Sequence, residues 1–526
     1  MNDKNMPSLN GTALQTLTVV ALLSLKLLLV KNMGLNNEVN VLPLAKQYMD
    51  PAWVPGDWYL NQPPGYRMLF QMLFGKLIMI GGFLATSLAG RLLCYVLVAL
   101  GIVRIGRRLD LSLPVLLTAV GLFLYNQSLA AGEELAGGLE AKSVAYGLIL
   151  LAIGLMLEGR YRLTALLLGV ATSFHILVGG WAFLAMLGWL APRRDDRPSW
   201  TWFGQALLIY LTGSVFAVKP VLEQLFTSTP PGSIPPSYVY VYLRVPHHVN
   251  PMSWQFGWWV KPIVYLLGLA FSVGLLWFKR QPERPPQYYA ASIGLAEFTL
   301  ITLVPFMLGL AVAPFDSKGL LLQYYPFRLG DVMLPLNTCL LFACALEHTF
   351  TGRARQGLLL VCIVGLGLMV TTRAILFQRE VTALRAFPGP NQQVDPHWKD
   401  LCDWVRNNTP KDAIVVTPPG AMGFSSFTWL AERPTIANYK LIPQTKAGIL
   451  AWYERMRDLS GDTATWPARP LARYSGPTGY FRLTTANAES VMAKYLADYF
   501  VTRPNHRLDL PIAHRNSLYT LYTKGK

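Results

Sequence analysis

Long apolar stretches alternate with short polar segments along the first 380 residues of the chain. Runs close to the ~20 residues that cross a bilayer recur, so the pattern predicts a polytopic α-helical membrane protein with about nine spans. The predicted spans are residues 13–33, 84–106, 112–130, 143–158, 201–219, 259–278, 288–314, 326–348 and 356–376.

Two further apolar stretches do not fit one straight span each. Residues 162–191 are flanked by cations on both sides and are interrupted near His175 and Gly179-Gly180. They are predicted to form a short helix pair that enters the membrane and returns to the same side. Residues 66–82 end at Gly81-Gly82 and are predicted to form an amphipathic helix at the interface.

Lysine and arginine in the short loops predict the orientation, because these residues are enriched on the cytoplasmic side. The cationic loops are RIGRR (104–108), GRYR (159–162), PRRDDR (192–197), KRQPER (279–284) and GRAR (352–355). With these loops inside, the N-terminus is cytoplasmic and the first helix is an uncleaved signal anchor. Residues 34–66 then form an outer loop, and the expected location is the plasma (inner) membrane.

The composition changes after about residue 380, where charges and prolines become frequent. Helical spacing of apolar residues at 398–405 is followed by strand-like runs at 413–417, 499–502 and 518–523, and residues 486–496 read as a helix. The chain is therefore divided into a membrane domain, residues 1–380, and an exterior soluble α/β domain, residues 381–526.

Composition supports the membrane class and argues against a nucleic-acid-binding protein and against a protein stabilised by disulfides or zinc. Hydrophobic residues make up 52% of the chain and charged residues 14%, against roughly 25% charged in soluble proteins. The net charge of +17 comes in large part from loop cations that set topology, so we expect no nucleic-acid partner. The five cysteines form no CxxC pair, which argues against a disulfide framework or a zinc site.

Acidic residues gather in two predicted outer segments. The first loop, NNEVNVLPLAKQYMDPAWVPGDW, contains Asp50 before a proline, as in a turn. The second is EELAGGLEAK. Carboxylates near the bilayer can act as general bases, metal ligands or binders of sugar hydroxyls, or they can simply be solvated loop acids. The candidates for a site are Glu38 and Asp57 in the first segment and Glu133, Glu134 and Glu140 in the second.

Three further residues are candidates for substrate binding. Lys142 could bind phosphate or extend to the interface, and Glu140 could instead favour a helix N-terminus. Arg328, in YYPFRLGD, has a guanidinium suited to phosphate oxygens, although Asp331 could be its partner. His175 is ionisable within an apolar segment, which is a functional hypothesis or a structural contact. The segment NYKLIPQ (438–444) could cover a substrate or pack on the membrane domain.

This layout resembles the GT-C class of integral-membrane glycosyltransferases, and more closely an uncharacterised bacterial, often cyanobacterial, family of similar proteins. The resemblance is carried by NNEVNVLPLAKQYMDPAWVPGDWYL, EAKSVAYG, SFHILVGGW, YYPFRLGD and WVRNNTPKDAIVVTPP. It implies transfer of a sugar from a polyprenyl-phosphate donor on the outer face, with a first-loop carboxylate as base or metal ligand. Glu38 then takes the base role with Asp57 as second choice, Arg328 holds phosphate, and a divalent cation is a candidate cofactor.

Two other functions fit the same pattern. A transporter or flippase for a lipid-linked or small solute would use the broken segment around His175, near the middle of the membrane. A non-catalytic scaffold of the cell envelope would act through the exterior domain. The enzyme hypothesis requires an acidic residue facing a cavity with a cation within reach.

Overall fold

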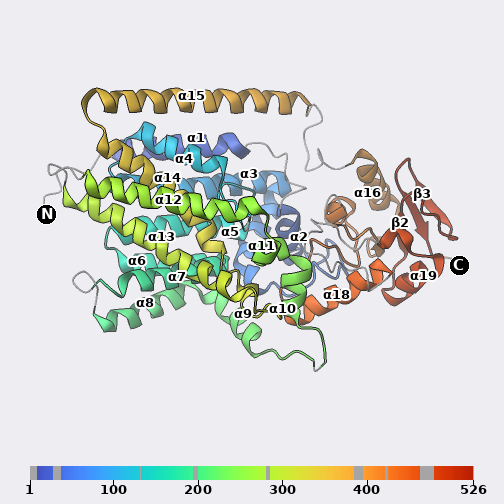
Figure 1. Ribbon diagram of the computed structural model, residues 1–526. Coiled ribbons are helices and arrows are strands. Elements are labelled where there is room, and N and C mark those ends of the chain that lie inside the picture. The colour runs from blue at the N-terminus through green and yellow to red at the C-terminus, as the bar shows by residue number, and fades with distance from the viewer. Residues whose placement is uncertain are drawn as a thin grey trace.

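The computed structural model describes residues 9–27, 37–130, 132–193, 199–230, 232–279, 285–383, 395–420, 424–461 and 479–524. The described residues up to residue 383 form a bundle of helices, and the C-terminal part lies at one end of the bundle (Figure 1). Parts of five predicted segments fall outside the described residues: 13–33, 34–66, PRRDDR, KRQPER and 381–526.

The bundle contains fifteen named α-helices in its described residues, several of them short. They are α1 (Leu9–Leu27), α2 (Glu38–Met49), α3 (Met68–Arg108), α4 (Leu113–Tyr125), α5 (Ala141–Leu157), α6 (Tyr161–Phe174), α7 (Ile176–Leu190), α8 (Trp200–Gly213), α9 (Val215–Phe226), α10 (Pro236–Tyr238), α11 (Pro246–Val249), α12 (Phe256–Phe278), α13 (Pro286–Val312), α14 (Arg328–Thr349) and α15 (Gly352–Ala383). Short helical turns η2 (Gly65–Arg67), η3 (Val239–Arg244), η4 (Pro251–Ser253) and η5 (Leu322–Tyr324) lie between them.

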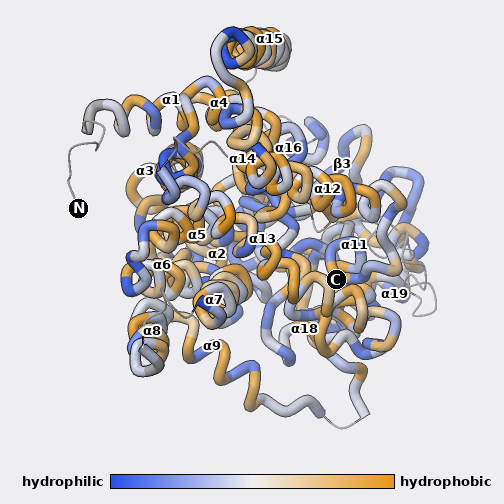
Figure 2. The backbone as a smooth tube through the Cα atoms, turned by 60° about the vertical axis from the view of Figure 1, so that its left-hand side comes forward, coloured by the Kyte–Doolittle hydropathy of each residue, from blue (hydrophilic) through white to orange (hydrophobic). Residues whose placement is uncertain are grey.

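Several helices have the length and hydropathy of membrane spans, which supports the membrane class predicted from the sequence. Five described helices qualify alone, and a bent pair raises the number to six. The five are Gly65–Arg108, Phe256–Phe278, Pro286–Val312, Arg328–Thr349 and Gly352–Thr372. Shorter apolar helices complete the bundle, and hydrophobic residues run along it in Figure 2. Helix α15 lies along the outside of the bundle, beside α1 and α4 (Figures 1 and 2).

Several helices of the bundle are kinked or broken at defined positions. In α3 the chain kinks at Gly82, whose φ of 73° suits glycine, at the place where the sequence predicts the end of an interfacial helix. Helices α6 and α7 are separated at His175, as predicted for a short helix pair. Within the span predicted for 201–219 the chain is broken, because α8 and α9 are bent by 92° at Ser214.

Closely packed glycines lie beside this second bend. A Cβ atom on Gly169 of α6 would approach the carbonyl oxygen of Tyr210 on α8 to 2.3 Å. A Cβ atom on Gly213 would lie 2.7 Å from the carbonyl oxygen of Leu166. The backbones of α6 and α8 therefore touch, and the hydroxyl of Ser173 donates to the carbonyl oxygen of Gly213 at 2.7 Å.

The C-terminal part contains a four-stranded sheet in the order β1-β2-β4-β3. Strand β1 pairs in parallel with β2, and the other two pairs are antiparallel. Strand β3 was not anticipated; it is an edge strand of the sheet, and none of its four residues is buried. The elements are α16 (Pro396–Asn408), β1 (Val415–Val416), η6 (Phe424–Ser426), α17 (Phe427–Ala431), α18 (Lys446–Ser460), η8 (Tyr480–Arg482), α19 (Thr485–Lys494), β2 (Tyr499–Thr502), β3 (Ile512–Arg515) and β4 (Thr520–Thr523).

The C-terminal part is joined to the bundle by buried contacts. The carboxylate of Asp57 accepts a hydrogen bond from the backbone N–H of Thr435 at 3.0 Å. The carbonyl oxygen of Lys440 accepts from Asn40 at 3.4 Å and from Arg244 at 3.1 Å. Leu441 packs in an apolar cluster with residues of the first loop. The loop 438–444 therefore lies directly against the end of the bundle.

Candidate functional site

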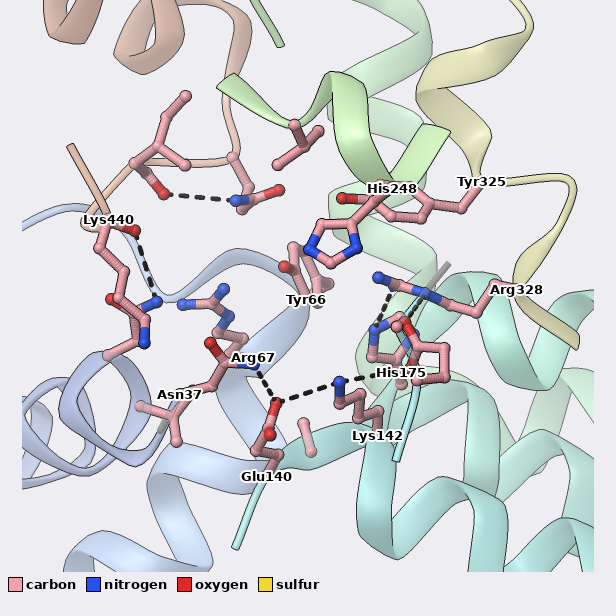
Figure 3. A pocket seen from close by; sticks show the side chains of 18 of the residues that line it. Asn37, Tyr66, Arg67, Glu140, Lys142, His175, His248, Tyr325, Arg328 and Lys440 are labelled. Atoms are coloured by element: carbon pink, nitrogen blue, oxygen red, sulfur yellow. Dashed lines mark hydrogen bonds and ion pairs between the residues drawn. The ribbon is translucent and has the colours of Figure 1, made fainter. Parts of the chain in front are cut away.

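A pocket of about 180 Å³ lies where the bundle meets the C-terminal part (Figure 3). Its walls come from segments far apart in the sequence, which meet only in the folded chain. The lining residues are Asn37, Asn40, Val41, Tyr66, Arg67, Gly132, Glu133, Glu140, Ala141, Lys142, His175, Tyr240, Arg244, Val245, His248, Tyr325, Arg328, Lys440, Ile442 and Gln444.

The lining of this pocket is strongly cationic. Five lysine and arginine side chains line it, against two carboxylates. The cations are Arg67, Lys142, Arg244, Arg328 and Lys440, and the carboxylates are Glu133 and Glu140. Two histidines and three tyrosines add further polar groups. A partly enclosed site with excess positive charge suits a ligand that carries negative charge, such as a phosphate.

Glu133 lies at the centre of this charge arrangement. Its Oε1 is 2.8 Å from Nε of Arg328, and its Oε2 is 3.3 Å from Nζ of Lys142. Burial alone would raise the pKa of the Glu133 carboxyl, but the guanidinium and the ammonium outweigh burial and lower that pKa. Asp331 holds the loop in place by accepting hydrogen bonds from the backbone N–H groups of Leu129, Ala130 and Glu133, at 3.0, 2.7 and 3.2 Å.

Glu140 precedes the first turn of α5 and presents a partly exposed carboxylate to the pocket. Its Oε2 accepts a hydrogen bond from Nδ2 of Asn37 at 3.0 Å and lies 3.6 Å from Nζ of Lys142 (Figure 3). Lys142 is on the same helix, two residues further. One ammonium group therefore contacts both pocket carboxylates.

Arg328 begins α14 and points into the pocket across the break between α6 and α7. Its Nη1 lies 3.1 Å from Nε2 of His175, and its guanidinium lies 3.9 Å from the centre of the Tyr325 ring. The hydroxyl of Tyr146 donates to the backbone oxygen of Arg328 at 3.0 Å. The helix break at His175 thus places an imidazole beside this arginine, as Figure 3 shows.

The wall contributed by the C-terminal part carries Lys440. Burial lowers the pKa of the Lys440 ammonium to about 8, and the nearby Glu140 only partly opposes this effect. Arg244, at the end of η3, donates to the backbone oxygen of Lys440 and lies over the Tyr439 ring. The pocket therefore includes a lysine with a pKa of about 8.

Three predicted site residues lie outside the pocket lining. Glu38 is fully buried and accepts hydrogen bonds from Ser87, from Arg91 through Nε and Nη2, each at 2.8 Å, and from the backbone N–H of Leu139 at 2.6 Å. Asp57 is buried between the backbone N–H groups of Leu60 and Thr435, and this burial raises its pKa to about 6.

Glu134 is exposed, and its carboxylate does not line the pocket. The other candidates for substrate binding, Glu133, Glu140, Lys142, His175 and Arg328, all line it. A catalytic role for Glu38 or Asp57 stays a prediction, and the pocket geometry gives it no support.

Sequence reasoning missed several residues of the lining, above all Arg67, Arg244 and His248. Arg67 follows a Gly-Tyr pair at the start of a long apolar run, and that position was a usable signal. The ring of His248 reaches the pocket, beside Gly132.

The residues of the pocket do not fit a divalent cation. No group of three or more His, Cys, Asp or Glu side chains comes together in the described part of the chain. The two pocket carboxylates are already in contact with Lys142 and Arg328. Mg²⁺ and Ca²⁺ require about six oxygen ligands, which this set does not provide.

Comparisons with known proteins bear on the fold. Residues 396–459 match a family model described as a domain of unknown function, DUF6798. No curated protein matches the chain. Among solved structures, the arabinofuranosyltransferase AftD from Mycobacteria aligns with a TM-score of 0.53 and 13% identity, covering 100% of this chain and 40% of AftD.

The Archaeoglobus fulgidus oligosaccharyltransferase in the apo form aligns with a TM-score of 0.46 and 11% identity, covering 94% of this chain and 69% of the other. The archaeal oligosaccharyltransferase AglB, in complex with an inhibitory peptide and a dolichol-phosphate, gives a TM-score of 0.45 at 11% identity, with the same coverage. The chain spans only two fifths of the length of AftD. The likeness to AftD shows that the chain has a fold similar to that of this arabinofuranosyltransferase, and five described helices of the chain are long and apolar enough to cross a membrane.

Proposed function

We propose that the protein transfers a sugar from a polyprenyl-phosphate-linked donor to an acceptor at the outer face of the plasma membrane. The observation that carries this proposal is the cationic pocket at the end of the bundle, with five lysine and arginine side chains against two carboxylates. A donor of this kind has its prenyl chain in the bilayer and its phosphate at the membrane surface. The pocket would receive the phosphate while the apolar helices border the lipid.

Arg328 is the best-placed group for the donor phosphate. Its guanidinium is held by Glu133, His175 and the Tyr325 ring, so few rotamers remain to be lost on binding. A guanidinium can bind two phosphate oxygens at once. Lys142 and Arg67 line the same pocket and would supply further positive charge as the phosphate leaves.

Glu140 is the best candidate for the general base. Its carboxylate lines the pocket, whereas those of Glu38 and Asp57 are enclosed by hydrogen bonds elsewhere. In the proposed reaction an acceptor hydroxyl attacks the anomeric carbon and gives its proton to Glu140. The bond between that carbon and the phosphate oxygen breaks, and the phosphate leaves with the electron pair.

The transport alternative requires a site near the middle of the membrane. His175 does line the pocket, but so do Lys440, Ile442 and Gln444 from the C-terminal part. These residues favour a site at the end of the bundle.

The test is product analysis with radiolabelled polyprenyl-phosphate sugars and purified protein in lipid nanodiscs. A general base contributes roughly 10²–10⁴-fold, so Glu140→Gln is expected to lower the transfer rate at least ~100-fold. Glu489→Gln, at an exposed position of α19, is the matched control and should transfer at the wild-type rate. Transfer by Glu140→Gln at the wild-type rate would remove Glu140 from this role, and absence of transfer by the wild type from any such donor would refute the proposed donor class.

A further inference from the structure

Lys142 lies between the two carboxylates of the pocket. Its Nζ is 3.3 Å from Oε2 of Glu133 and 3.6 Å from Oε2 of Glu140. Its side chain is 12% exposed, so the ammonium is near the surface of the pocket and still largely enclosed. Glu133 and Glu140 stand at either end of one loop, and their carboxylates converge on one cation. In many metal sites a metal ion bridges two carboxylates in this way, and here the ammonium of Lys142 has that position.

The surroundings of this ammonium oppose its replacement by a metal ion. Oε1 of Glu133 is in contact with Arg328, and Oε2 of Glu140 accepts a hydrogen bond from Asn37. The acids of the first loop are unable to complete a metal site, because Glu38 is bound by Arg91 and Asp57 by backbone N–H groups. A divalent cation would therefore have to displace Lys142 and lie close to the guanidinium of Arg328, which repels it.

An ammonium can do part of the work of a metal ion here. It is a compact point charge with three N–H donors. Two donors can be directed at Glu133 and Glu140, and the third is left for an oxygen of the ligand. Positive charge next to a departing phosphate stabilises the charge that develops there, whether an ion or a side chain carries it.

We propose that Lys142 takes the place of a divalent cation in this pocket, so that the protein binds its phosphate ligand and acts on it without a metal ion. In this proposal Lys142 is a positioning and charge-neutralising residue that holds Glu133 and Glu140 together. The ligand's identity rests on the proposed function above, whereas the exclusion of a metal by Lys142 does not.

The first experiment measures Mn²⁺ alone, by electron paramagnetic resonance on the full-length protein in nanodiscs. We expect the wild-type protein to bind no Mn²⁺ in this pocket. The amount of Mn²⁺ bound should therefore be the same for the wild type and for Glu133→Gln. Lys142→Met keeps the length of the side chain and removes its charge, and it should bind Mn²⁺ at least tenfold more tightly than the wild type. Adding Glu133→Gln to Lys142→Met should abolish that binding, and Lys411→Met, at an exposed position, is the control for the loss of a lysine.

The second experiment measures binding of farnesyl phosphate by calorimetry, with farnesol as the uncharged control. Wild-type affinity is expected to agree within twofold between EDTA and Mn²⁺. Lys142→Met should bind at least tenfold more weakly in EDTA and should recover affinity when Mn²⁺ is added. Recovery by the ion distinguishes a lost charge from a damaged fold, and Lys142→Gln serves as a second variant if the methionine form does not purify.

The outcomes separate this proposal from the proposed function. A wild-type protein whose Mn²⁺ is released by Glu133→Gln, or whose affinity for farnesyl phosphate rises tenfold with Mn²⁺, overturns the role of Lys142. A folded Lys142 variant that gains neither Mn²⁺ binding nor Mn²⁺-dependent affinity overturns it as well. If neither wild type nor variant binds farnesyl phosphate, the donor class fails, and the Mn²⁺ measurement alone decides the role of Lys142.

Discussion

Replacing Glu38 with glutamine is expected to destabilise the fold strongly and to affect transfer only through that loss. Glu38 and Arg91 form a buried pair with side chains 0% and 1% exposed, and Nε–Oε1 and Nη2–Oε2 distances of 2.8 Å. Removing one charge of such a pair leaves the other without compensation, which costs about 3–5 kcal/mol. We therefore expect Glu38→Gln to lose stability of this size.

A double substitution checks the reasoning behind that magnitude. Replacing a whole buried pair by apolar residues is often neutral or stabilising, so Glu38→Leu with Arg91→Met should recover most of the loss. The N–H of Leu139 would still lack its acceptor, at 2.6 Å in the wild type, and an unsatisfied buried donor costs about 1–3 kcal/mol. A residual deficit of that order should remain.

The assay is unfolding by denaturant in detergent, followed by tryptophan fluorescence, with transfer measured on the same preparations. We expect the wild type to be the most stable protein, the double variant to be intermediate, and Glu38→Gln to be the least stable. The reasoning is refuted if Glu38→Gln unfolds at the same denaturant concentration as the wild type while its transfer rate falls 100-fold or more. Glu38 would then act on the reacting groups directly.

Three further predictions address the pocket and the bundle. Arg328→Lys keeps the charge but loses the planar guanidinium, so it should weaken binding of farnesyl phosphate about tenfold in calorimetry, a free-energy change of about 1.4 kcal/mol, whereas Arg482→Lys, exposed on η8, should not. Lys440 has a pKa lowered from 10.5 to about 8, so farnesyl phosphate binding should fall as the pH rises through about 8, and Lys440→Met should flatten this profile. Because burial disfavours the protonated lysine, the same group should make the fold more stable as the pH rises from about 8 towards 10.5, and a Lys440→Met profile of unchanged slope would contradict both statements. Gly82→Ala should cost about 1–3 kcal/mol in detergent unfolding, since φ is 73° there, while Gly365→Ala, with open space around the new methyl group, should be close to neutral.

Local patterns anticipated the features that depend on local chemistry. The glycine pair at 81–82 indicated the kink in α3, and the polar interruption near His175 indicated the break between α6 and α7. Cations and carboxylates beside the apolar runs indicated the pocket residues Glu133, Glu140, Lys142 and Arg328, and an ionisable residue within an apolar run indicated His175. Such residues are costly near a membrane, so their presence at span ends was informative.

The partners of the first-loop acids could not be predicted in the same way. Arg91 lies within an apolar run, 53 residues after Glu38, and nothing in the local pattern links the two. The pairing depends on how α2 packs against α3, which is a property of the whole bundle. Likewise, the 92° bend at Ser214 lies beside a contact between α6 and α8 whose residues, Ser173 and Gly213, are 40 positions apart in the sequence.

The bond between Asp57 and the backbone of Thr435 has a consequence for how such proteins diverge. A main-chain donor places no demand on the side chain at 435, whereas the acceptor at 57 requires a short carboxylate. The C-terminal part could therefore change much of its surface during evolution and still dock, provided that the first loop kept its aspartate. Lys440, which lies within the segment matched by DUF6798, shows the same arrangement, because its backbone oxygen accepts hydrogen bonds from the side chains of Asn40 and Arg244. If C-terminal parts are exchanged between relatives, whether they dock should then depend on the side chains that the first loop and η3 present to them.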